Sequence, residues 1–186
     1  MQNVELPLKS LFLMRHAKSS WSSDAADDFS RPLNERGMRD AKWVAELFKK
    51  RDWRPERIVY SAAKRSTVTA ECLGQTFTQA KEVISNEGLY FARMEQLLSV
   101  ATETPESVSQ LLLIGHNPGM EQLLIHLCPA SEYQDNGKLL TTANVVHIGL
   151  TGTWSELSRD KGRCLEHVRP KSIGYLSQER YSTDPV

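Results

Sequence analysis

The sequence predicts a three-layer α/β/α fold, in which helices cover both faces of a mainly parallel central sheet. Short apolar runs typical of buried strands alternate along the chain with segments whose apolar residues recur at helical spacing. The length of 186 residues and the 40% share of apolar residues suit one domain with a substantial core. We expect residues 1–174 to form this single domain and the polar residues 175–186 to form a C-terminal tail.

The first half of the chain contains two strand-like and two helix-like segments. The run from Leu11 to Met14 is apolar throughout, as in a strand buried on both faces. A polar stretch with Ser, Asp and Pro follows it, and Asn34 is then a plausible N-cap for the first helix. The expected strands are residues 11–14 and 57–61, and the expected helices are residues 34–50 and 66–76.

The second half continues the alternation around the strongest apolar run in the chain. Residues 111–114 are all Leu or Ile, and Gly115 ends the run. We expect helices at residues 94–102 and 119–127, and further strands at residues 111–114, 144–150 and 164–168. Strands that alternate with helices indicate βαβ units, in which ligands bind at the carboxyl ends of the strands.

Composition excludes several other classes of protein. Lys and Arg together number 23, as do Asp and Glu, so the zero net charge argues against a nucleic-acid partner. No stretch approaches the ~20 consecutive apolar residues of a membrane span, and residues 1–10 lack a signal peptide's apolar region. The widely spaced Cys72, Cys128 and Cys164 are expected to be free thiols, which favours the cytoplasm. The sequence leaves the oligomeric state open.

Chemically useful side chains follow three of the apolar runs. Arg15 and His16 come directly after the first expected strand, Arg65 shortly after the second, and His116 after the run that Gly115 ends. An arginine presents a planar fork of donors that matches phosphate oxygens, and a histidine serves as a nucleophile near neutral pH. Two arginines and two histidines at one sheet edge predict phosphoryl transfer through a histidine.

Four motifs reinforce this interpretation and together span most of the chain. They are F-L-M-R-H-A (12–17), D-F-S-R-P-L (28–33) with Gly37, S-A-A-K-R-S (61–66) with Thr69 and Ala70, and G-H-N-P-G (115–119), with Leu89 and Tyr90 besides. This set resembles the histidine phosphatase superfamily, with Ala17 where the R-H-G signature of that family has glycine. It is most similar to the small SixA-like branch of bacterial phosphohistidine phosphatases.

The resemblance implies a phosphoglycerate mutase-like fold and a mechanism. By similarity, His16 attacks phosphorus and forms a phosphohistidine intermediate, which water then hydrolyses. Arg15 and Arg65 clamp the phosphoryl oxygens, His116 donates a further hydrogen bond, and no metal or other cofactor is required. From its position just after the signature, Lys18 is a candidate to add positive charge for phosphate binding at the mouth of the pocket.

Other polar and aromatic residues are given less specific roles. The five histidines show no H-E-x-x-H motif and no tight ligand spacing, so no metal site is expected. We expect His126, His147 and His167 to serve packing or the surface, and the four tryptophans, Trp21 among them, to anchor packing. Asp28 and Arg31 are expected to brace the polar loop. Glu87 is the nearest candidate for a general acid, with an ordinary surface role equally open.

The preferred substrate is phosphohistidine on a protein. The chain lacks the long cap insertion of larger family members, so residues 18–32 and 128–142 are the segments that can cover the pocket. An open pocket suits a phosphorylated protein side chain better than a small sugar phosphate. The first alternative is a phosphatase for small phosphomonoesters, and the second is a non-catalytic module that binds phosphate.

Overall fold

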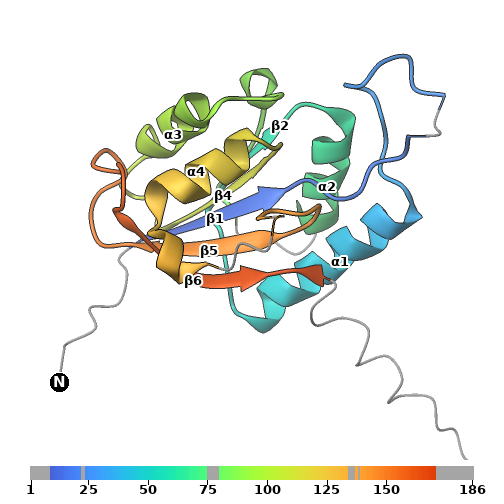
Figure 1. Ribbon diagram of the computed structural model, residues 1–186. Coiled ribbons are helices and arrows are strands. Elements are labelled where there is room, and N and C mark those ends of the chain that lie inside the picture. Colours follow the sequence, from blue (N-terminus) through green and yellow to red (C-terminus); the bar gives the residue numbers. More distant parts are fainter. Residues whose placement is uncertain (1–8, 22–23, 75–79, 134–136, 138, 171–186) are drawn as a thin grey trace, which may run out of the picture.

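The computed structural model describes residues 9–21, 24–74, 80–133, 137 and 139–170 (Figure 1). The expected tail at residues 175–186 lies outside these ranges, as does the predicted end of the second helix near Thr76. No helix in the described part of the chain is long and apolar enough to cross a lipid bilayer.

A six-stranded sheet forms the middle layer, with the strand order β3-β2-β4-β1-β5-β6 (Figure 1). The strands β1 to β4 pair in parallel, whereas β5 runs antiparallel to both of its neighbours. The prediction of a mainly parallel sheet is therefore confirmed. The strands are β1 Lys9–Arg15, β2 Arg57–Ser61, β3 Glu82–Asn86, β4 Gln110–Gly115, β5 Val145–Leu150 and β6 Gly162–Val168.

Helices form the two outer layers, as expected. Helices α1 and α2 cover one face of the sheet, and α3 and α4 cover the other (Figure 1). The Asn34 side chain caps α1 by accepting a hydrogen bond from the Gly37 amide at 2.8 Å. The helices are α1 Glu35–Lys50, α2 Lys64–Gly74, α3 Met94–Thr102 and α4 Gly119–Leu127, with short 3-10 turns η1 Glu87–Leu89 and η2 Ala130–Glu132.

The apolar run of β1 feeds two separate cores because side chains alternate between the faces of a strand. Leu11 and Leu13 pack with α3 and α4, whereas Phe12 and Met14 pack with α1 and α2. All four side chains are fully buried. A strand covered on both faces needs apolar residues at every position, so the run carried a clear signal in the sequence.

Strand β3 has no counterpart among the predicted elements. It lies at the edge of the sheet, where it pairs with β2 alone. Its sequence, Glu-Val-Ile-Ser-Asn, is half-buried or exposed at every position, so it lacks the apolar run that marks the central strands. Helix α2 begins at Lys64, two residues before the predicted start, which places Arg65 within its first turn.

Candidate active site

A cavity of about 210 Å³ opens at the carboxyl ends of β1, β2 and β4. It brings together all five side chains singled out in the sequence, namely Arg15, His16, Lys18, Arg65 and His116. Both predicted covering segments contribute to its wall. The remaining lining residues are Ser19, Trp21, Asp28, Arg31, Phe91, Asn117 and Thr142.

Strand register places the two histidines side by side. Strands β1 and β4 are neighbours, and Arg15 pairs with Gly115 at their ends. The His16 amide donates to the Gly115 carbonyl at 3.1 Å, and the His16 and His116 ring centroids lie 4.9 Å apart. Arg65 reaches the same point from the first turn of α2, where a cation opposes the helix dipole. An anion in the cavity would offset that unfavourable placement.

The His16 ring is held in one orientation and one tautomer. Its Nδ1 lies 2.7 Å from the Ala17 carbonyl oxygen, an acceptor only, so Nδ1 carries the proton. Nε2 is therefore a free base, and it accepts a hydrogen bond from Arg65 Nε at 3.3 Å. Burial, together with the neighbouring His116 and the two guanidiniums, lowers the pKa of His16 to about 3. His16 Nε2 is thus a neutral, nucleophilic nitrogen within the cavity.

His116 is fixed through its other nitrogen. Its Nε2 lies 2.8 Å from Ser61 Oγ, which accepts the Ala63 amide proton and can donate its own proton to the ring. When Ser61 donates to Nε2, Nδ1 carries the ring proton, and Nδ1 has no hydrogen-bond partner among the described residues. The same holds for the buried Nε of Arg15. Burial and then the charge of Arg65 lower the pKa of His116 to about 3. Unpaired buried donors of this kind suit a tetrahedral anion.

Asp28 organises the arginine side of the cavity. Arg65 donates to its carbonyl oxygen at 2.5 Å and to its carboxylate at 2.9 Å, and the Tyr90 hydroxyl donates to the same carboxylate at 2.8 Å. Arg31 forms an ion pair with Asp28 at 2.7 Å, which is the predicted loop brace. Burial would raise the pKa of Asp28, but the hydrogen bonds from Tyr90 and Arg31 and the charge of Arg65 lower it to about 2.

The link from Asp28 to Arg65 is the part of the site that sequence reasoning missed. The motif D-F-S-R-P-L drew attention to Asp28, but its partner on α2 is 37 positions away along the chain. Trp21 was also misjudged, because it is 77% exposed at the cavity wall and does not anchor a core. Its large ring is covered on one side by the Arg31 guanidinium, 3.7 Å from the ring centroid.

Glu87, His147 and His167 fall outside the cavity. Glu87 is exposed on η1 and does not line the cavity, so Asp28 is its one carboxylate among the described residues. His147 stacks on Phe12, and His167 lies 3.2 Å from the Asn144 amide, both in packing roles. Lys18 is half-buried at the cavity wall. Its backbone lies very close to α1, which fixes this part of the chain against the helix.

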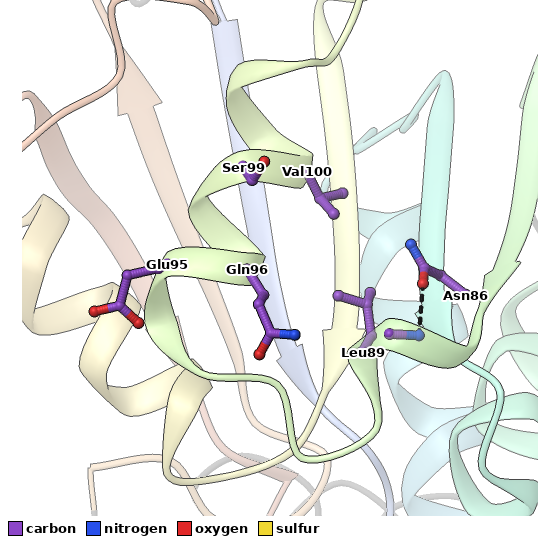
Figure 2. Close-up of a pocket in the computed structure, with 7 residues that line it drawn as sticks. Asn86, Leu89, Glu95, Gln96, Ser99 and Val100 are labelled. Atoms are coloured by element: carbon purple, nitrogen blue, oxygen red, sulfur yellow. Dashed lines mark hydrogen bonds between the residues drawn. The ribbon is translucent and has the colours of Figure 1, made fainter.

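A larger hollow of about 390 Å³ lies between η1 and α3 (Figure 2). Among the described residues that line it, Glu95 is the one ionisable side chain, and neither arginine nor histidine contributes. The Asn86 side chain is occupied in capping η1, since it accepts the Gly88 amide proton at 2.8 Å (Figure 2). This hollow therefore offers no group for phosphoryl transfer, in contrast to the smaller cavity.

We expect both site histidines to stay neutral well below the ordinary histidine pKa of ~6.5. In the free protein at 25 °C, imidazole ¹⁵N shifts of His16 and His116 should remain those of neutral rings at pH 5, because their pKa values are about 3. Below pH ~6.5 the unfolded chain then binds more protons than the folded one. The contribution of the two histidines to the stability of the folded state is therefore complete above that pH and is lost as the pH falls towards 3. A titration midpoint near 6.5 for His16 would contradict this picture.

Comparison with known proteins agrees with the sequence motifs. The family model of the Histidine phosphatase superfamily (branch 1) matches residues 11–91, which include Arg15, His16 and Arg65. Phosphohistidine phosphatase SixA of Escherichia coli K12 is 28% identical over 148 residues, which cover 75% of this chain and 84% of the relative. An uncharacterized chloroplastic protein of Arabidopsis thaliana is 30% identical over 132 residues, or 65% of this chain. The match spans 60% of the length of that relative.

Solved structures share the fold. The protein histidine phosphatase SixA complexed with tungstate has a TM-score of 0.74 at 23% identity, and the match covers 88% of this chain and 99% of that one. A mycobacterial glucosyl-3-phosphoglycerate phosphatase has a TM-score of 0.56 at 16% identity and covers 84% of this chain and 96% of its own. The predicted phosphoglycerate mutase-like fold is thus confirmed. The fold, the motifs and these relatives agree in their similarity to the histidine phosphatase superfamily, and to its SixA-like branch in particular.

Proposed function

We propose that the protein is a metal-independent phosphatase in which His16 carries the phosphoryl group. The observation that supports this most is the His16 Nε2 atom, unprotonated and 3.3 Å from a fully buried arginine in a cavity that also contains Arg15 and His116. The phosphoryl group spreads negative charge over its oxygens during transfer, and the two guanidiniums supply the opposite charge that a metal ion supplies elsewhere.

The reaction proceeds in two displacements. The Nε2 lone pair of His16 forms a bond to phosphorus while the bond to the leaving group breaks, and the leaving group departs with that electron pair. Water then attacks phosphorus, the Nε2–P bond returns its pair to the ring, and inorganic phosphate leaves with the protons of the water. The Ala17 carbonyl, 2.7 Å from Nδ1, stabilises the ring while it carries the phosphoryl group.

The preferred substrate is phosphohistidine on a protein. Among the described residues, Asp28 is the one carboxylate that lines the cavity. Hydrogen bonds and the charge of Arg65 keep its pKa at about 2. It is therefore ionised at neutral pH and cannot protonate a leaving group. An alkoxide needs such a proton, because water and alcohols are weak acids with a pKa of ~15.7 for water. An imidazole that is already protonated at its second nitrogen leaves as a neutral ring and needs none.

A substrate comparison tests this proposal. We expect the purified protein, assayed with a chelator present, to hydrolyse a phosphohistidine-containing protein and aryl phosphates much faster than sugar phosphates or phosphoserine peptides. The rate on phosphomonoesters should fall as the leaving group becomes more basic, because no carboxylic acid assists its departure. Faster turnover of alkyl phosphomonoesters would favour the small-molecule alternative. Absence of turnover on every substrate would favour the non-catalytic module.

A further inference from the structure

We propose that Phe91, together with Trp21, holds the planar ring of the leaving imidazole and so selects phosphohistidine over other phosphoryl donors. This inference rests on the proposed function, since it names what lies beyond the phosphoryl group in the same cavity. Phe91 and Trp21 are the two aromatic side chains among the described residues that line the cavity, and both are more than half exposed. They are thus available for contact with a bound substrate.

The exposure of Phe91 is imposed by its neighbours. Leu89 and Ala92 on either side are 1% and 4% exposed, whereas Phe91 is 52% exposed. Figure 2 shows the Leu89 side chain directed towards Val100 of α3, which anchors the segment to the core. On the other side, the Ala92 carbonyl lies against Gly119 so closely that a Cβ there would be 2.0 Å from the oxygen. The chain between these anchors presents an apolar ring outward.

The backbone at Phe91 supports a functional constraint. Its φ of 49° lies in the left-handed region, which is unfavourable for a bulky side chain and easily adopted by glycine. A residue kept in such a conformation with its side chain 52% exposed gains only part of the burial that would compensate for the strain. Strain of this kind concentrates at ligand-binding and catalytic positions. We therefore attribute it to the position that the ring takes in the cavity.

The ring of Phe91 lies next to the groups that would bind phosphate. Its centroid is 5.3 Å from the His116 ring centroid and 5.7 Å from the Arg65 guanidinium carbon. A phosphoryl group bound between His116 and Arg65 has its leaving atom one bond from phosphorus. The centroid of an imidazole attached through that atom therefore falls within about 4.5–7 Å of the Phe91 ring centroid, which is the range of aromatic contacts. Tyr90, by contrast, is committed to Asp28 through its hydroxyl.

Trp21 offers a second aromatic surface from the loop that follows β1. The ring is 77% exposed, and the ion pair between Arg31 and Asp28 holds the guanidinium that stacks on it. The stack orients the ring, because the Arg31 side chain is itself fixed by Asp28. An aryl or imidazolyl substrate gains contact with such rings, whereas a donor without a ring does not.

The test compares two donors that share a reactive P–N bond and differ in the ring. A phosphohistidine-containing peptide carries the imidazole, and inorganic phosphoramidate carries ammonia in its place. For Phe91→Ala we expect the ratio of kcat/KM on the peptide to kcat/KM on phosphoramidate to fall about tenfold, mainly through KM. Trp21→Ala should shift the ratio in the same direction. Leu165→Ala removes an exposed apolar side chain on β6, outside the cavity lining, and should leave the ratio unchanged.

Phe91→Gly separates binding from folding. Glycine adopts the positive φ without strain, so thermal unfolding of this variant should occur no lower than that of Phe91→Ala, while the substrate ratio falls as far. An unchanged ratio in active variants, or an equal loss on both donors, would overturn the aromatic selection and leave the phosphatase proposal standing. Failure of the wild-type protein to hydrolyse either donor would overturn the proposed function itself.

Discussion

Replacement of His16 by alanine is expected to lower kcat by at least about 10⁴-fold, the scale seen when a covalent nucleophile is removed. The variant keeps both arginines and therefore still binds phosphate, but it has no atom that can accept the phosphoryl group. Rapid acid quench of the wild-type protein should trap a phosphoenzyme only briefly stable in acid and stable in alkali, as a phosphoramidate is. His16→Ala should show none.

The fold of this variant should persist. His16 is 7% exposed, but its neighbours are the polar groups of the cavity, and the hydrogen bond that its ring makes to the backbone is the 2.7 Å bond to the Ala17 carbonyl. Loss of a hydrogen bond of this kind lowers the free energy of unfolding by about 1 kcal/mol, and a domain with two large cores remains folded after such a loss. His126→Ala, at the end of α4 and outside the cavity lining, is the matched control and should remain active. Near-normal turnover by His16→Ala would refute the covalent mechanism.

The sequence predicted the central elements well because burial on both faces leaves a continuous apolar run. Strand β2 folds with its predicted bounds, 57–61, and helices α3 and α4 fold with theirs, 94–102 and 119–127, because their apolar residues recur at helical spacing. Edge strand β3 escaped prediction because an edge needs no such run, and its Val83 is 55% exposed. Register between β1 and β4, which sets the spacing of the two histidines, depends on pairing between positions 100 residues apart, such as Arg15 and Gly115, and leaves no local pattern.

The site was predictable where a side chain directly follows a strand, as His16 and His116 do, because parallel strands end at one sheet edge. The orientation of each ring was not predictable in the same detail, since it depends on partners such as Ser61 and Ala17 in three dimensions. The exposure of the Phe91 ring carries no sequence signal, because a phenylalanine in an apolar segment such as Leu89 to Ala92 ordinarily indicates a core position.

Replacement of Arg65 by lysine should lower kcat/KM by roughly 10³-fold, even though the positive charge is kept. The guanidinium of Arg65 is 1% exposed and donates at once to His16 Nε2 and to the carbonyl and carboxylate of Asp28. A lysine ammonium is a single point charge on a flexible stem and cannot span these acceptors in one plane. The affinity for tungstate or vanadate should fall with activity, because the same fork would bind the oxygens of those anions.

Arg65→Ala should be worse than Arg65→Lys in both activity and stability. It leaves the Asp28 carboxylate without its buried partner, and the loss of one member of such a pair costs more than the pair contributes. Arg36→Lys, on α1 with its 3.3 Å partner Asp40, is the control and should change neither quantity, since lysine keeps the positive charge and a pair one helical turn apart stabilises a helix little. Retention of anion binding by a folded Arg65→Lys variant would show that the phosphate is held elsewhere. The dependence on the planar fork is expected because the equatorial oxygens of a transferring phosphoryl group lie in one plane, and Arg15 at the end of β1 lines the same cavity as a second source of such donors.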